Sequence, residues 1–274
     1  MNDYRPLTTE EIEVLKHNDC WAEDWTSVNV SEDFKPNFMH RVMLYGEINI
    51  GSFNKNVEVS QGFVKHSGIN NATLRNVTIG DDCLIENVGN FINNYTIGDD
   101  CYISNISTLE TTEGATYGEG NLVSVLNEVG EGNVILFSDL NSQLAAFMEM
   151  KEKIRQLIKT DIDNKMPDRG QIGNNVKIIN TKEITNCVIN DYCEVNGASR
   201  LSDCTLLGSV HGNVYIGTGV ITENSIIAEG ASVINSVKIQ DCFVGEACQL
   251  SNGFTASASV FFANSYMSNG EACA

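Results

Sequence analysis

The sequence predicts an all-β solenoid of triangular coils, in which three short strands joined by corners make one coil. The hexapeptide TIGDDC occurs twice, at residues 78–83 and 96–101, so its copies start eighteen residues apart. Weaker copies of the same pattern recur along much of the chain. Because three six-residue sides make eighteen residues, we expect the two TIGDDC copies to lie directly above one another on adjacent coils.

Each repeat consists of an aliphatic residue, often a glycine, two polar residues and a small residue. Later copies are IGNNV at 172–176, INDYC at 189–193, IGTGV at 216–220 and VGEAC at 244–248. The aliphatic residue and the small residue four positions later are expected to point inward, and strands of successive coils to pair about 4.8 Å apart. Glycine and asparagine suit the corners because they tolerate left-handed backbone angles.

The cysteines fit this inward ladder better than they fit a chemical site. Cys83, Cys101, Cys193 and Cys248 all fall at the small inward position, so we expect them to be buried and unbridged. Nine cysteines without any CxxC pair do not indicate a disulfide framework or a zinc site. The alternative, a metal bound by Cys83 and Cys101, lacks a nearby histidine or further cysteine.

Composition limits the classes of partner. The formal net charge is −19 and the pI is about 4.4, which disfavours nucleic acid as a partner. The first twenty residues lack the basic and apolar regions of a signal peptide, and no apolar run is long enough for a membrane span. We therefore expect a cytoplasmic protein with neither nucleic-acid nor membrane partners.

Residues 1–40 carry no repeats and are expected to form a helical and irregular cap. Thr8 and Glu11 have the spacing of a capping box, so a short helix should start there. The aromatic residues that follow are expected to cover the first coil, which would otherwise expose its core and strand edges; they are Trp21, Trp25, Phe34 and Phe38.

A second break in the repeats, at residues 139–168, predicts one inserted amphipathic helix of about six or seven turns. Ser138 or Asp139 can cap it and Pro167 stops it. Its apolar stripe packs either along the side of the solenoid or on the same helix of another subunit. The stripe consists of Leu140, Leu144, Phe147, Ile154, Leu157, Ile158 and Ile162.

The break divides the solenoid into a first segment, residues 41–138, and a second segment, residues 169–274. The first is less regular, and its glycine-rich stretch 111–120 predicts a protruding loop or a coil with lengthened corners. Such loops form ligand sites in this architecture. The second segment ends inside a repeat at Ala274, so we expect a longer natural chain or a partner that covers the open end.

The IGDDC, IGNNV, IGTGV and VGEAC units resemble the hexapeptide-repeat superfamily, and this resemblance implies a left-handed parallel β-helix. The units around 186–193 and 235–242 also look like the β-helical part of sugar-1-phosphate nucleotidyltransferases. The whole layout resembles an uncharacterised bacterial family loosely described as sugar-nucleotide-pyrophosphorylase-related. The superfamily resemblance implies a homo-oligomer, with a trimer favoured, and a sugar or sugar nucleotide as ligand.

Hexapeptide-repeat acyltransferases use a histidine as general base, with acyl-coenzyme A as donor. His211 is the better candidate here, because Gly208 and Gly212 bracket it, and His66 is the second. One hypothesis is therefore an acyl- or acetyltransferase acting on a sugar or sugar nucleotide. The other is a binding or oligomerisation module without turnover, or the β-helical part of a longer sugar-nucleotide enzyme. The acidic charge favours binding without turnover, since coenzyme A carries phosphates.

Overall fold

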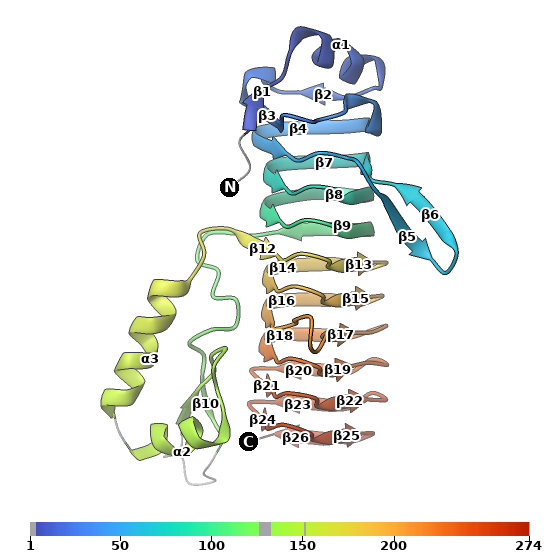
Figure 1. The fold of residues 1–274 in the computed structure, drawn as a ribbon. Coiled ribbons are helices and arrows are strands. Elements are labelled where there is room, and N and C mark those ends of the chain that lie inside the picture. Colours follow the sequence, from blue (N-terminus) through green and yellow to red (C-terminus); the bar gives the residue numbers. More distant parts are fainter. Residues whose placement is uncertain (1–3, 126–132, 151, 274) are drawn as a thin grey trace.

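The computed structural model describes residues 4–125, 133–150 and 152–273, and it shows a mostly β protein. Of its strands, 22 belong to one hydrogen-bonded sheet, which is parallel except where β1 pairs with β3. Figure 1 shows these strands stacked one above the next from β4 to β26, with a helical insertion along one side. The order of the chain is thus the order of the stack.

The first half of the stack begins within the predicted cap. Its strands are β1 (Tyr4–Pro6), β2 (Trp21–Ala22), β3 (Val28–Ser31), β4 (Met39–Ile50), β7 (Gly68–Ile79), β8 (Leu84–Ile97) and β9 (Tyr102–Glu110). The helix α1 (Thr9–His17) begins with the predicted capping box between Thr8 and Glu11. Two 3-10 turns follow, η1 (Trp25–Ser27) and η2 (Pro36–Phe38).

The cap differs from the prediction in two respects. It contains three strands, and β2 and β3 both pair in parallel with β4, so the sheet already begins there. Phe34 is buried in the main core, whereas Trp21 remains 50% exposed. Trp21 packs on Tyr45 instead of covering the stack, with 5.3 Å between the ring centroids.

The second half of the stack consists of short strands. They are β12 (Gly170–Ile172), β13 (Lys177–Ile179), β14 (Glu183–Ile189), β15 (Glu194–Asn196), β16 (Arg200–Leu206), β17 (Tyr215–Ile216), β18 (Ile221–Ile227), β19 (Ser232–Val233), β20 (Lys238–Gln240), β21 (Phe243–Val244), β22 (Gln249–Ser251), β23 (Thr255–Ser257), β24 (Val260–Phe261), β25 (Tyr266–Ser268) and β26 (Glu271–Cys273). Their aliphatic residues continue the same core.

The repeat sets the pairing register. Thr78 pairs with Thr96, and Ile79 with Ile97, so the two TIGDDC copies do lie one above the other. The predicted spacing of eighteen holds there, because Asp81 and Asp99 are 18 residues apart. In the second half the corresponding spacing is 17, as between Asn174 and Asp191.

The turns confirm the prediction of left-handed backbone. At one turn position of successive repeats, Asp82, Asp100, Asn175 and Tyr192 all have φ between 56° and 58°. Asparagine and aspartate tolerate this conformation better than most residues, whereas Tyr192 is an unusual occupant. The stack thus imposes this geometry even where the residue type does not favour it.

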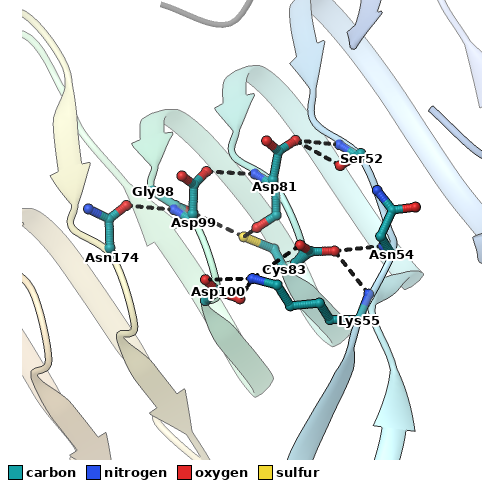
Figure 2. A network of polar contacts seen from close by, with 10 residues as sticks. Ser52, Asn54, Lys55, Asp81, Cys83, Gly98, Asp99, Asp100 and Asn174 are labelled. Carbon is teal, nitrogen blue, oxygen red and sulfur yellow. Dashed lines mark hydrogen bonds and ion pairs between the residues drawn. The ribbon is translucent and has the colours of Figure 1, made fainter. Parts of the chain in front are cut away.

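A ladder of carboxylate and amide oxygens fixes the same turns (Figure 2). Oδ1 of Asp81 accepts the Ser52 N–H at 2.7 Å, and Oδ1 of Asp99 accepts the Asp81 N–H at 2.7 Å. Oδ1 of Asn174 then accepts the Asp99 N–H at 2.8 Å. Each repeat therefore satisfies a backbone donor of the repeat before it.

The hairpin of β5 (Asn56–Ser60) and β6 (Phe63–His66) was not predicted. It leaves the stack beside this ladder and projects from it (Figure 1). Oδ1 of Asp82 accepts the backbone N–H groups of Asn54, at 2.6 Å, and Lys55, at 3.0 Å. The Lys55 Nζ lies 2.8 Å from Oδ1 of Asp100. These contacts anchor the root of the hairpin.

The inward cysteines confirm the prediction. Cys83, Cys101, Cys193 and Cys248 are buried and free. Burial raises the pKa of the Cys193 thiol to about 12, so it stays a neutral thiol at physiological pH. A second inward row, which was not predicted from the sequence, contains Cys187, Cys204 and Cys242, and all three are free thiols. Cys187 and Cys204 occupy opposite positions on the neighbouring strands β14 and β16.

The stacked strands of the first half end at Glu110, earlier than the predicted boundary at residue 138. The chain then forms the antiparallel pair β10 (Leu122–Ser124) and β11 (Asn133–Ile135), followed by two helices. It rejoins the stack at β12, which pairs with β8 in the register Ile97 to Ile172. The inserted region therefore spans about twice the length expected from the helix pattern.

The prediction of a single inserted helix is wrong. Two helices, α2 (Ser142–Met150) and α3 (Glu152–Lys165), run in different directions (Figure 1). Asn141 caps α2 by accepting the N–H groups of Gln143 and Leu144. Neither predicted cap, Ser138 or Asp139, serves that role, whereas Pro167 does follow the end of α3 as predicted.

The apolar stripe of the insertion packs along the side of the stack, which was one of the two alternatives. Met148 of α2 and Ile158 of α3 join Ile226 and Phe243 of the stack in a second buried cluster. Two helices of different direction can both face this cluster. Phe147 and Leu157, also assigned to the stripe, remain 49% and 63% exposed.

Candidate binding site

A cavity of about 170 Å³ lies between the insertion and the side of the stack. The inner wall of the cavity belongs to the stack. It is formed by strands β12, β14 and β16, together with one residue directly after β14 and one directly after β16. The inner-wall residues are Gln171, Val188, Asn190, Thr205 and Leu207. The insertion supplies the outer wall, formed by Tyr117, Glu119, Phe137, Ser138, Asp139, Asp161, Ile162, Lys165, Met166 and Pro167.

Polar contacts join separate parts of the outer wall. Oε2 of Glu119 accepts the Ser138 N–H at 3.1 Å, and the other carboxylate oxygen contacts the Ser138 hydroxyl. The buried Tyr117 donates its hydroxyl to the carbonyl of Pro167 at 3.2 Å. The wall is thus tied together at two points distant in sequence.

The outer wall is also attached to the stack. Thr205 donates its hydroxyl to the carbonyl of Tyr117 at 2.8 Å, and Gly118 approaches the backbone of Asp203 and Ser225 closely. A Cβ atom on Gly118 would lie 2.8 Å from the Asp203 carbonyl oxygen. Only glycine, here at a φ of +79°, allows this approach.

The charges around the cavity are unequally compensated. Lys165 lies 2.7 Å from Oδ2 of Asp161 and 3.4 Å from Oδ2 of Asp139, and the hydrogen bond to Asp161 raises its pKa. Burial raises the pKa of the Glu119 carboxyl, although hydrogen bonds from Ser138 oppose this effect. Glu119 is therefore a partly desolvated carboxyl that no lysine or arginine contacts within the described residues.

A shallower groove of about 700 Å³ adjoins this cavity and shares Ser138, Asp139 and Leu207 with it. Glu229 and Glu246 line the groove on the side of the stack. The surface beside the cavity is thus also acidic, in keeping with the charge of the whole chain.

His211 lies in an exposed loop, residues 208–213, that leaves the stack directly after Leu207. Its backbone N–H donates to Oγ of Ser209 at 3.0 Å, and that hydroxyl contacts the Glu229 carboxylate. Its imidazole makes no hydrogen bond to any part of the chain that the structure describes. His211 is near the cavity in sequence but does not line it.

His66 has a packed environment at the end of β6. Its ring stacks on Phe38, with 3.7 Å between centroids and 9° between planes. Its Nδ1 lies 2.9 Å from the carbonyl oxygen of Ser67. One ring face and one ring nitrogen are therefore engaged, and the structure does not place His66 and His211 in a common site.

The sequence pointed to part of this cavity without identifying it. Tyr117 and Glu119 lie in the glycine-rich stretch 111–120, which was expected to form a loop of the kind that binds ligands. Nothing in the sequence linked that stretch to Ser138 or Lys165, because their proximity depends on how the insertion docks.

Two further findings concern the described residues alone. None of them forms a group of three or more His, Cys, Asp or Glu side chains that could hold a metal ion. In the same residues, no helix has the length and apolar character needed to cross a membrane.

Fold and cavity define a mostly β protein of stacked parallel strands with a small cavity under a helical insertion. Residues 4–274 match the family described as a domain of unknown function (DUF4954), and the chain belongs to that family. It is also similar to an uncharacterized protein of Treponema pallidum (strain Nichols), with 28% identity over 252 residues. The match covers 84% of this chain and 34% of that protein, so the chain spans about a third of its relative's length.

Proposed function

We propose that the stack is a left-handed parallel β-helix of the hexapeptide-repeat type. Three observations support this proposal: the repeat spacing of 18 or 17 residues, the left-handed backbone at equivalent turns, and the inward rows of aliphatic and small residues. The handedness comes from the resemblance to that superfamily.

On this scaffold, we propose that the chain is a binding module that holds a small hydroxyl-rich ring, such as a sugar, in the cavity under the insertion. The observation that carries this proposal is the cavity itself. Its volume of about 170 Å³ is close to the roughly 150 Å³ of a cavity that holds a benzene ring, so it has room for a six-membered ring whose hydroxyl substituents extend toward the adjoining groove. Apolar Phe137 and Ile162 suit the C–H face of a pyranose, while Asn190 and Gln171 offer amides to its hydroxyls.

The charges favour the sugar over a phosphate as the group held in the cavity. Lys165 is the one basic residue among the described lining residues, and Asp139 and Asp161 already pair with it. Phosphate groups usually require basic contacts. The phosphates of a sugar nucleotide would therefore lie outside the cavity.

Filling the cavity should weaken the binding of a sugar. Val188 lies on β14, is half-buried, and lines the inner wall. Val188→Phe is expected to reduce the affinity for a bound monosaccharide at least about tenfold, because the larger ring occupies the ligand's volume. Isothermal titration calorimetry against a panel of neutral and amino monosaccharides measures this.

Ile179→Phe is the matched control, since Ile179 is a half-buried β-branched residue on β13, away from the cavity. It should leave the affinity unchanged. If Val188→Phe bound the same sugar as tightly as the unaltered protein, or if none of the panel bound, the proposed site would be wrong.

Acyl transfer is the second candidate function, favoured by the position of His211. Its loop starts beside Leu207, so a ligand in the cavity would lie near this loop. In this mechanism, His211 takes a proton from a hydroxyl or amino group of the sugar as that group attacks the thioester of acyl-coenzyme A. The acyl group is transferred to the sugar, and coenzyme A leaves as the thiol. His66 is the less favoured base, because its ring is stacked and hydrogen-bonded.

If this second function is correct, His211→Ala should reduce coenzyme A release about a hundredfold or more, as expected for loss of a general base. A thiol-reactive dye measures the release from acetyl-coenzyme A in the presence of the sugar. His17→Ala, at the exposed end of α1, is the control. Equal release by His211→Ala and the unaltered protein would exclude His211 as the base.

A further inference from the structure

Glu119 is the distinctive polar group of the cavity. It belongs to the outer wall and is half-buried, and its only side-chain partner in a hydrogen bond among the described residues is Ser138. No ion pair within those residues includes it, whereas Asp139 and Asp161 both pair with Lys165. The cavity thus contains one carboxylate that forms no ion pair within the described residues, while the charge of Lys165 acts on it from a greater distance.

We propose that the ligand of this cavity carries an ammonium group that pairs with Glu119, so that the ligand is a hydroxylated primary amine such as an amino sugar. This inference rests on the proposed function, because it specifies the ligand of the same site. A partly desolvated carboxylate without an ion-pair partner is unfavourable, and a bound ammonium group would supply that partner. The pairing would also form a charge-assisted hydrogen bond, which is stronger than a neutral one.

An anionic ligand fits the same geometry less well. It would have to displace Asp139 and Asp161 from Lys165 while lying near Glu119. Glu229 and Glu246 in the adjoining groove add further negative charge. Charge complementarity therefore favours a cation throughout this surface.

The test compares three probes of the same ring size by isothermal titration calorimetry on the full chain at pH 7 and low salt. These are D-glucosamine, which carries an ammonium group, and D-glucose and N-acetyl-D-glucosamine, which are neutral. Glucosamine is expected to bind about tenfold more tightly than glucose, the difference between a charge-assisted and a neutral hydrogen bond. Its affinity should fall as salt is added, while that of glucose should not.

Glu119→Gln removes the charge but keeps an oxygen that can accept the Ser138 N–H. It should lower the affinity for glucosamine about tenfold and leave that for glucose within about twofold. Asp163→Asn is the matched control, because it makes the same change of charge at an exposed residue of α3 that does not line the cavity. It should affect glucosamine much less than Glu119→Gln does.

The outcomes separate the two proposals. Equal binding of glucose and glucosamine, without salt dependence, would overturn the ammonium proposal and leave the sugar-binding function in place. If Glu119→Gln lowered the affinities for glucose and glucosamine equally, the ammonium proposal would also be overturned, since Glu119 would then only support the cavity wall. Failure of all three probes to bind would overturn both proposals. The salt dependence needs no variant, so the test holds even if Glu119→Gln folds poorly.

Discussion

Replacing Cys101 by arginine should unfold the protein. Cys101 has no exposed surface, and its thiol donates to the carbonyl of Gly173 at 3.0 Å, so no space or water is available for a guanidinium group. An uncompensated buried charge costs about 3–5 kcal/mol or more, a large part of the roughly 5–15 kcal/mol that stabilises a typical domain. Urea unfolding followed by circular dichroism should show little or no folded baseline.

Cys273→Arg is the matched control, because Cys273 is also a free cysteine in a strand of the stack but is exposed. Its urea midpoint should equal that of the unaltered protein. A cooperative transition of Cys101→Arg at the normal midpoint would mean that Cys101 does not point into the core.

Adding one methyl group at Gly170 should destabilise the protein by about 3 kcal/mol, at the upper end of typical overpacking costs. Gly170 begins β12, where the chain returns from the insertion to the stack. A Cβ atom there would overlap Oγ1 of Thr111 and the ring of Tyr95. Neither group can move freely, because Thr111 and Tyr95 are both buried.

Tyr95 also has a structural role that the methyl group would disturb. Its hydroxyl donates to the carbonyl of Cys187 at 3.0 Å and accepts the Cys187 N–H at 3.1 Å. Displacing the ring would leave these buried backbone groups without partners. Chemical denaturation of Gly170→Ala measures the loss.

Gly270→Ala is the control for this change, because a Cβ atom at Gly270 meets nothing closer than the Phe254 ring at 3.7 Å. Its stability should change by less than about 0.5 kcal/mol, as for most surface substitutions. An unfolding midpoint of Gly170→Ala equal to that of Gly270→Ala would contradict the close packing at the start of β12.

The repeats determined much of the architecture because the same local pattern recurs. Ile79 and Ile97 had to face the same core, since each is the aliphatic residue of a TIGDDC unit, and they pair as expected. The buried Cys83 and Cys101 follow from the same argument. The capping box of Thr8 and Glu11 was predictable for a different reason, because its two hydrogen bonds join residues only three positions apart.

The insertion shows where such reasoning stops. Its apolar periodicity predicted helix over residues 139–168, but not the division into α2 and α3. Periodicity records which residues are buried, whereas the direction of each helix depends on the surface that receives it. That surface includes Ile226 and Phe243, which lie on strands far along the chain.

The candidate site depended on tertiary structure almost entirely. Sequence reasoning chose His211 and His66 by residue type, because histidines are the usual bases of this architecture. The cavity instead brings together Glu119, Ser138 and Lys165, which no repeat or motif connects. By itself, the sequence determined the repeating strands, the inward rows and the N-terminal helix, since these depend on neighbours at fixed spacing. Only the docking of the insertion on the stack decided the cavity and the place of Glu119 in its wall, because contacts between distant segments depend on the shapes of both surfaces.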